Sequence, residues 1–320
     1  MKILVTGAAG YIGSTVIKFL LDEDFEVIGI DNLMHGGDSI IQYFNNEKFT
    51  FFNGDISNLE DVKQVLSEDI HAVIHLAAIV GDPACSNDPE LATKTIWNGS
   101  KLLLDYAEKM KVNRFIFAST CSNYGKMSKD TVLDEEGELK PVSLYAKLKV
   151  QVEAYIKQQN FEHLKPTVLR FSTVYGTSSR MRFDLTVNHF TKDAFTDGKL
   201  LVFGEQFWRP YCHVTDICRA LILVIKSPIE KVEDTFNVGN SSENYTKKMI
   251  SEIIQKIMPE TKIEYVKKDE DPRDYKVNFD KIKNVLGFNT TKTVEDGVYE
   301  VYNLLKNNII TDVNNKKYIN

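Results

Sequence analysis

Short apolar runs alternate with amphipathic stretches through the first half of the chain. The apolar runs predict strands near residues 2–6, 25–30, 49–52, 72–78, 114–119 and 167–171. Apolar positions at helical spacing predict helices after residue 13 and over 59–66, 89–111 and 143–159. Runs that are apolar throughout are typical of strands buried on both faces. The pattern therefore predicts an α/β fold with a doubly wound parallel sheet between two layers of helices.

The regular alternation ends after residue 171, where a polar segment follows. The predicted elements beyond it are helices over 185–196, 211–225, 247–257 and 294–305 and strands at 200–203 and 235–238. The strand at 235–238 is expected to return to the main sheet, which makes the second, smaller lobe interleaved with the first. The tail over 307–320 is rich in Asn and Lys, and we expect it to be loosely held.

Three glycines lie between the first predicted strand and the first predicted helix. Gly7 permits a tight turn, Gly10 lets the backbone approach a phosphate, and Gly13 lets the helix pack close to the strand. A helix N-terminus that follows such a glycine turn is a binding site for a diphosphate. The alternative interpretation is a tight turn between strand and helix that binds no ligand. Asp31 ends the second strand, where an acid meets the ribose hydroxyls of an adenosine.

These features predict a Rossmann dinucleotide-binding domain and a substrate lobe. The dinucleotide-binding domain comprises residues 1–174, with 210–238 returning to it. The smaller, interleaved C-terminal lobe comprises 175–209 and 239–320. Ligands of such sheets lie outside the carboxyl ends of the strands, which is where the glycine turn and Asp31 fall.

Composition narrows the class of protein further. The chain has 320 residues, of which 43% are apolar and 26% charged, and a net charge of −6. These values are ordinary for a soluble globular protein and argue against a general nucleic-acid or membrane-surface binder. No apolar run has the length of a membrane span and no signal peptide is visible, so we expect a cytoplasmic protein. The four cysteines form no CxxC pair and no metal-ligand spacing, and no metal site is expected.

Tyr145 and Lys149 are four residues apart in a predicted helix, so their side chains share one face. A phenol is a weak base at neutral pH, and an ammonium group one turn away lowers its pKa by favouring the phenolate. Thr120 ends the fifth strand, where its hydroxyl would hold a substrate oxygen. Such a pair is often an accident of an amphipathic helix, but it follows a nucleotide-binding half here. We therefore expect Tyr145 to remove a carbinol proton while hydride passes to NAD, with Thr120 and Lys149 in support.

The chain resembles, nearly end to end, the extended short-chain dehydrogenase/reductase family of NAD-dependent nucleotide-sugar epimerases and dehydratases. The resemblance rests on motifs at Thr6–Gly13, Asp31–Leu33, Gly54–Ile56, His75–Ala78, Ser119–Gly125, Tyr145–Lys149 and Arg209–Val214. It implies an enzyme with NAD as cofactor, preferred over NADP because of Asp31. The cofactor-binding residues that it implies are Gly7, Gly10, Tyr11, Ile12, Asp31, Asn32, Asp55, Ile56, Leu76, Ala77, Ala78, Tyr145 and Lys149.

The residues after Thr120 discriminate between the reactions of this family. In similar 4,6-dehydratases an acid pair, or a glutamate two positions on, drives the elimination of water. Cys121 and Ser122 occupy these positions here, and neither side chain can replace a carboxylate in the reaction. Dehydration and the related decarboxylation are therefore disfavoured. Oxidation and reduction at C4 remain, by a 4-epimerase, a 4-dehydrogenase or a 4-ketoreductase. A non-catalytic dinucleotide-binding sensor is the alternative, and the intact catalytic residues argue against it.

Arginines in the second half predict the site of a nucleotide-diphosphate sugar. Guanidinium groups bind phosphate oxygens in a bidentate manner that lysine lacks. The resemblance places Arg209 and Arg273 on the diphosphate and Asn188 nearby; solvated surface positions are the alternative, more so for Arg180 than for Arg273. The full predicted substrate set is Ser122, Asn123, Thr173, Arg182, Asn188, Arg209 and Arg273.

Two finer expectations rest on resemblance alone. The run at 180–188, with Ala78–Pro83 and the pair Thr120 and Ser122, resembles bacterial GDP-heptose 4-dehydrogenases of capsule synthesis. It implies a GDP-linked sugar such as GDP-heptose, and a role in capsule or lipopolysaccharide sugar synthesis. Helices near 90–110 and 143–159 commonly pair across a two-fold axis in such families, so a homodimer is expected.

Overall fold

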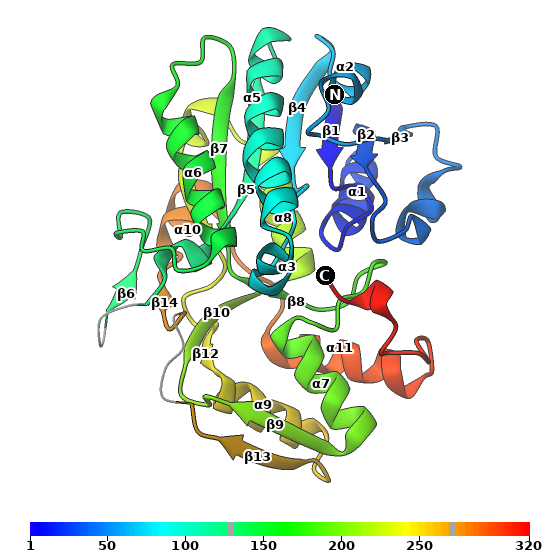
Figure 1. The fold of residues 1–320 in the computed structure, drawn as a ribbon, viewed down its shortest axis with the longest axis vertical. Helices are drawn as coiled ribbons and strands as arrows, with labels where there is room; N and C mark the ends of the chain where they lie inside the picture. The colour runs from blue at the N-terminus through cyan, green and yellow to red at the C-terminus, as the bar shows by residue number, and fades with distance from the viewer. Residues whose placement is uncertain (127–130, 269–272) are drawn as a thin grey trace.

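A seven-stranded parallel sheet forms the centre of the larger part of the molecule (Figure 1). The computed structural model describes residues 1–126, 131–268 and 273–320. The strand order is β11-β7-β5-β4-β1-β2-β3. The strands are β1 Lys2–Thr6, β2 Glu26–Asp31, β3 Phe49–Asn53, β4 Ile70–His75, β5 Arg114–Thr120, β7 Lys165–Phe171 and β11 Thr235–Val238. The predicted fold class, a doubly wound parallel sheet, is confirmed.

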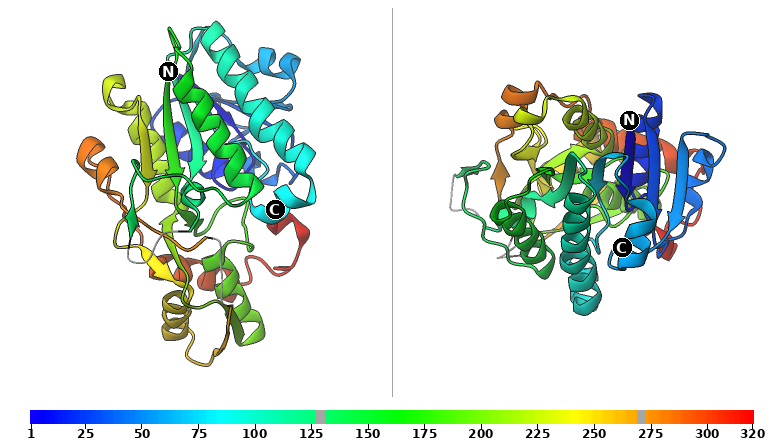
Figure 2. Two further views of the ribbon diagram at one scale, coloured as in Figure 1. Left: turned by 60° about the vertical axis from the view of Figure 1, so that its left-hand side comes forward. Right: turned by 90° about the horizontal axis from the view of Figure 1, so that it is seen from above.

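Helices cover both faces of this sheet because successive side chains of each strand point to opposite faces. In β1, Ile3 and Val5 are buried in one core with α1 and α8, whereas Leu4 is buried in the opposite core with α2, α5 and α6. Figure 2, seen from above, shows the two helical layers on either side of the strands. The helices are α1 Gly13–Asp22, α2 Leu59–Val65, α5 Ser100–Lys109, α6 Leu144–Gln158, α8 Val214–Lys226 and α10 Asp280–Leu286.

The smaller lobe lies beyond the carboxyl ends of the strands (Figure 1). It contains a three-stranded sheet of β8, β10 and β12 and a pair formed by β9 and β13. Its elements are β8 Thr173–Tyr175, α7 Thr186–Asp197, β9 Lys199–Phe203, β10 Trp208–His213, β12 Asn244–Thr246, α9 Lys247–Ile257, β13 Lys262–Val266 and α11 Val294–Lys306. A separate pair, β6 Val132–Leu133 and β14 Lys276–Val277, lies beside it. Tyr175, Val187, Ile250 and Val298 belong to the core of this lobe.

Three local predictions differ from the structure. The helix expected over 89–111 is divided: after α3 (Asp82–Asn87), α4 (Pro89–Ala92) runs into a π-helical turn, Thr93–Gly99, before α5. The segment predicted to turn into a helix from 211 stays extended in β10 as far as His213, because it pairs with β8 and β12. The strand β13 was not predicted, since most of its side chains are exposed and it shows little apolar signal.

The prediction of a loosely held tail is wrong. The ring of Tyr318 lies edge-on to that of Phe183, with 5.5 Å between ring centroids, and the Phe183 amide donates to the Tyr318 carbonyl at 2.9 Å. Ile310 and Val313 pack against the same small core. These apolar residues anchor the tail, and its end lies where the two lobes meet (Figure 1).

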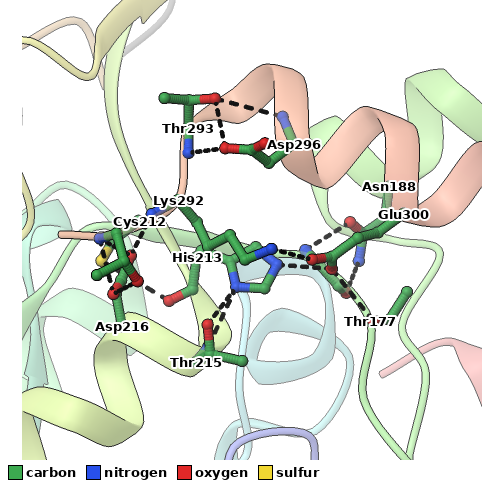
Figure 3. Close-up of polar contacts among 12 residues, drawn as sticks. Thr177, Asn188, Cys212, His213, Thr215, Asp216, Lys292, Thr293, Asp296 and Glu300 are labelled. Atoms are coloured by element: carbon green, nitrogen blue, oxygen red, sulfur yellow. Dashed lines mark hydrogen bonds and ion pairs between the residues drawn. The ribbon is translucent and has the colours of Figure 1, made fainter.

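A polar network joins β10 and α8 to α11 (Figure 3). The Glu300 carboxylate on α11 accepts hydrogen bonds from Thr177 at 3.2 Å and pairs with His213 Nε2 at 2.9 Å. Its other oxygen lies 3.1 Å from Lys292 Nζ. Burial opposes ionisation of Glu300, but the hydrogen bond and charge of His213 and those of Lys292 lower its pKa to about 2. Glu300 thus joins α11 to the end of β10.

Glu300→Gln is expected to lower the free energy of unfolding at pH 7 by roughly 1–3 kcal/mol. Because the pKa of Glu300 is lower in the folded protein, its contribution is present above the unfolded pKa of 4.5 and is lost as pH falls towards about 2. The difference between the variant and the native protein in urea unfolding should therefore be largest at pH 7, smaller at pH 3 and nearly absent at pH 2. Glu252→Gln, an exposed change on α9, is the control. An equal loss at all of these pH values would contradict the prediction.

Candidate active site

A cleft of about 600 Å³ lies at the carboxyl ends of the parallel strands, between the sheet and the smaller lobe. Most of the residues predicted for the site line it. They are Gly7, Gly10, Tyr11, Ile12, Asp31, Asn32, Asp55, Ile56, Leu76, Ala77, Ala78, Thr120, Ser122, Tyr145, Lys149, Thr173, Arg182, Arg209 and Arg273. Asn123 and Asn188 are absent from this lining within the described residues. The cleft therefore brings the glycine turn, the Tyr–Lys pair and the arginines to one place.

The glycine turn at the start of the cleft leaves space that side chains would fill. Gly7 has a positive φ of +71°, and a Cβ at this position would lie 2.9 Å from the Ala77 nitrogen. A Cβ at Gly13 would lie 2.0 Å from the Gly7 carbonyl oxygen. Within the described part of the chain, no side chain caps the N-terminus of α1. Residues 10–13 line the cleft at the N-terminal end of α1, and a helix N-terminus is where backbone N–H groups can bind a diphosphate.

Two fixed carboxylates lie beyond the glycine turn. Asp31 at the end of β2 accepts hydrogen bonds from the Leu33 amide at 2.8 Å and the Ala9 amide at 3.1 Å. Burial nevertheless raises the pKa of Asp31. Asp55, after the neighbouring strand β3, accepts from the Ser57 amide at 2.8 Å and lies 3.1 Å from Lys94 Nζ. Both carboxylates are oriented by backbone amides and keep lone pairs that can accept further hydrogen bonds, from ribose hydroxyls at Asp31 and from the adenine at Asp55.

The predicted catalytic residues come from β5 and α6. Thr120 is the last residue of β5, and its hydroxyl accepts from the Ser122 amide at 3.1 Å. Ser143 caps α6 by accepting from the Ala146 amide, which starts the helix just before Tyr145. Lys149 Nζ donates to the Ala118 carbonyl at 2.7 Å and lies 5.9 Å from the centre of the Tyr145 ring. An ammonium has three donors, so two remain for a ligand in the cleft.

Burial controls the ionisation of both members of the Tyr–Lys pair. It raises the pKa of Tyr145 above its ordinary value, and the Arg182 charge opposes this rise. It lowers the pKa of Lys149 to about 7. Lys149 Nζ lies 5.9 Å from the centre of the Tyr145 ring, and a lowering of the phenol pKa by this ammonium stays a prediction. Additional positive charge at the ring is needed before Tyr145 becomes an effective base.

Asn123 was predicted to bind substrate, but its side chain points into the protein. Thr120 is followed by a 3-10 turn, Cys121–Tyr124, in which successive side chains diverge. Ser122 lines the cleft, whereas Asn123 Nδ2 donates to Glu153 at 2.8 Å and to Ser119 at 3.1 Å. Glu153 is in turn paired with Arg170 at 2.7 Å. Asn123 therefore belongs to a buried polar network behind the site.

Asn188 on α7 is also fully occupied by the protein itself. Its Oδ1 accepts from the Gly176 amide at 3.0 Å, and its Nδ2 donates to the Arg182 carbonyl at 2.9 Å. The side chain is completely buried. Asn188 therefore positions the loop over 176–182 and does not face the cleft.

The arginines differ in their surroundings. The Arg209 guanidinium lies 5.3 Å from the centre of the Tyr275 ring, and the Tyr275 hydroxyl lies 3.4 Å from Ser122 Oγ. Arg273 pairs with Asp82 at 2.8 Å. Arg180, for which a solvated position was given more weight, is only 7% exposed and lines the cleft. This burial was missed because nothing in the local sequence marks it.

The described residues give little support for a metal site or for catalysis by His75 or a cysteine. They contain no group of three or more His, Cys, Asp or Glu side chains that could hold a metal ion. His75 is buried between Thr6 at 2.7 Å and Ser100 at 2.8 Å, and burial lowers its pKa to about 3. All four cysteines are buried and free. In the part of the chain that the structure describes, no helix has the length and apolarity of a membrane span.

A glycine turn, a fixed acid after β2 and a Tyr–Lys pair on one cleft are the features of a dinucleotide-binding site. Residues 3–239 match the NAD dependent epimerase/dehydratase family, and the chain belongs to this family. The family prediction made from the motifs is thereby confirmed, together with the NAD dependence that characterises the family.

Several 4-epimerases are similar to this chain over nearly its whole length. A UDP-glucuronate 4-epimerase of Thermodesulfobacterium geofontis is 30% identical over 321 residues, which cover 96% of each chain. The crystal structure of a UDP-glucuronic acid 4-epimerase from Bacillus cereus, in complex with UDP-glucuronic acid and NAD, has a TM-score of 0.85 at 28% identity. It covers 96% of this chain and 99% of that one. A UDP-glucose 4-epimerase from Thermotoga maritima, with UDP-glucose, has a TM-score of 0.84 at 28% identity and covers 97% and 100%.

Proposed function

We propose that the protein is an NAD-dependent 4-epimerase of a nucleotide-diphosphate sugar. The observation that carries the proposal is the position of Thr120, Tyr145 and Lys149 on the same cleft as the glycine turn, with Arg209 and Arg273 also lining it. The family match and the 4-epimerases among its relatives support the same reaction.

In this proposal Tyr145 accepts the proton of the sugar 4-hydroxyl and returns it at the end of turnover. The Thr120 hydroxyl donates its proton to the same oxygen while its own oxygen accepts from the Ser122 amide. Lys149 directs its remaining N–H donors to a ribose hydroxyl of the cofactor and toward Tyr145. Bound NAD supplies the hydride acceptor and the positive charge that a buried phenol needs. Asp31 and the first turn of α1 would hold its ribose and diphosphate.

The surroundings of Thr120 support oxidation and reduction without elimination. Cys121 is buried, and its Sγ donates to the Arg170 carbonyl at 3.3 Å. Burial raises the pKa of this thiol, so it stays protonated. Ser122, the next residue that reaches the cleft, has no carboxylate. The site thus offers no acid at the position from which a dehydratase assists the loss of water.

We infer a UDP-linked hexose or hexuronate as substrate, because the 4-epimerases that resemble this chain are named for UDP-sugars. The run Arg180–Asn188, with its likeness to GDP-heptose 4-dehydrogenases, favours GDP-heptose as the second candidate substrate and 4-dehydrogenation as the second candidate reaction. Arg209 and Arg273 would bind the diphosphate in either case.

The first experiment follows the reduced-nicotinamide absorbance of the purified protein while UDP-, GDP- and dTDP-linked sugars are added in turn. An epimerase should form bound NADH with one sugar, release none, and yield the C4 epimer in the NMR spectrum of the products. Accumulation of free NADH would establish a 4-dehydrogenase, and consumption of NADH with a 4-keto sugar a ketoreductase. Binding of NAD without turnover of any sugar would contradict the proposal and favour a sensor.

A further inference from the structure

The segment 176–180, here called the strap, leaves β8 and crosses the first turn of α1. The Tyr11 hydroxyl on the glycine motif donates to the Gly176 carbonyl at 2.6 Å, and Ser178 Oγ donates to the Tyr11 carbonyl at 2.7 Å. Thr15 Oγ1 donates to Ser178 Oγ at 3.2 Å. Gln42 reaches the strap as well, with Nε2 2.8 Å from Ser179 Oγ. The strap is therefore fixed to the helix end at which the diphosphate would bind.

The smaller lobe holds the strap from its other side. Asn188 accepts from the Gly176 amide, and Thr177 Oγ1 donates to Glu300 at 3.2 Å (Figure 3). A Cβ on Gly176 would lie 2.1 Å from His213 Nε2, so the backbone of the strap passes directly against that ring. Because both lobes fix the strap, the side chain at its end has a defined position.

That side chain is Arg180, which lines the cleft and is 93% buried, since 7% of its surface is exposed. Its Nε is buried without a hydrogen-bond partner among the described residues. Its Nη2 donates to the Ile319 carbonyl over a long distance of 3.4 Å. A guanidinium has five donors, and burying them with so little compensation is costly unless an anion joins them.

The charges around Arg180 leave room for a further anion. Asp31 and Asp184 attract the guanidinium, and neither lies within ion-pair distance of it in the described structure. Arg182 repels it, and burial with this repulsion lowers the pKa of Arg180 to about 10, so it stays charged at neutral pH. Burial and both arginines lower the pKa of His35 to about 4. His35 is therefore neutral and does not compete for an anion.

We propose that Arg180 binds the diphosphate of the dinucleotide cofactor, in addition to the backbone of the glycine turn. The strap is bound to Tyr11 through Ser178, two residues before Arg180, and the Arg180 charge acts on Asp31. Arg180 therefore belongs to the cofactor side of the cleft, whereas Ser122, Tyr275 and Arg209 form a separate group. This assignment rests on the NAD-binding role of the cleft. Its consequence is a cofactor held by both lobes, as an enzyme that keeps its NADH between two half-reactions requires.

The test compares Arg180→Gln and Arg180→Lys with the native protein after removal of bound nucleotide. Isothermal titration calorimetry with NAD, ADP and UDP measures the Kd of each. Arg180→Gln should weaken NAD and ADP about 10- to 100-fold, the usual effect of losing a charge-assisted pair, and change UDP less than about twofold. Arg180→Lys should lie between, because an ammonium lacks the bidentate geometry. Lys18→Gln removes an exposed charge from the middle of α1 and should change the Kd of none of the three ligands.

Thermal unfolding of the ligand-free variants separates this role from a structural one. Because Arg180 is buried with an unpartnered Nε, Arg180→Gln should leave the ligand-free melting temperature unchanged or raise it. Unchanged affinity for NAD and ADP, a selective loss of UDP binding, or a lowered melting temperature with loss of all three ligands would overturn the assignment. If sugars are not turned over but Arg180→Gln still weakens NAD, the proposed reaction fails and this assignment stands.

Discussion

Tyr145→Phe is expected to lower kcat about 10³-fold and to leave the Kd for NAD within about twofold. The change removes one hydroxyl from a side chain that lines the cleft and keeps the ring in place. The change removes the phenol that takes the proton of the 4-hydroxyl in the proposed reaction, whereas Lys149 and its bond to the Ala118 carbonyl stay in place. Steady-state kinetics with the sugar identified in the absorbance experiment, and titration with NAD, measure the two quantities.

Tyr155→Phe is the matched control for this change. Tyr155 lies on the same helix, and its hydroxyl bonds Asp105 at the protein surface. This variant should keep native kcat. Tyr145→Phe with native kcat would show that Tyr145 is not the base, and an equal loss in both variants would point to damage to α6.

Gly13→Ala is expected to abolish cofactor binding, with the Kd for NAD raised about 100-fold or more. The new Cβ would lie 2.0 Å from the Gly7 carbonyl oxygen and 3.0 Å from Ala8 Cα, and both are backbone atoms that cannot rotate away. The start of α1 and the glycine turn must then separate, which displaces the N–H groups that face the diphosphate. The midpoint of urea unfolding should fall as well, because Ala8 belongs to the core beneath this turn.

Gly37→Ala is the comparison for this variant. Its Cβ would meet only the Leu33 side chain, at 3.4 Å, which is ordinary contact. Its φ of −115° is open to alanine. We expect NAD affinity to stay within about twofold of native. Retention of native NAD affinity by Gly13→Ala would refute the account of the glycine turn.

The features predicted well from the sequence are those that depend on short patterns of neighbouring residues. The spacing of Gly7, Gly10 and Gly13 needs only a strand before it and a helix after it, and both are present. Tyr145 and Lys149 share a helix face because Ser143 caps that helix two residues before the tyrosine. The alternation of strands and helices was enough to predict the parallel sheet, because each buried strand is apolar over its whole length.

The features that were missed depend on contacts between distant parts of the chain. Whether the side chain after Ser122 faces the cleft or the core is decided by the 3-10 turn and by Glu153, 30 residues further on. Arg180 is buried because the strap is fixed to α1, more than 160 residues earlier in the chain. The tail is ordered because Tyr318 meets Phe183. No local pattern reports such pairings.

The order in which the chain visits its two lobes limits how the molecule can be divided. After β7 the chain leaves the main sheet for β8, β9 and β10 of the smaller lobe, and it returns through α8 and β11. It then leaves again for β12 and α9. Finally, α10 packs against the core that contains α1. A gene fragment that stops after β7 would therefore lack the edge strand β11 and the cover that α8 gives to Ile3 and Val5. Chimaeras that exchange sugar specificity within the family consequently need several junctions, because one fusion point cannot transplant this lobe.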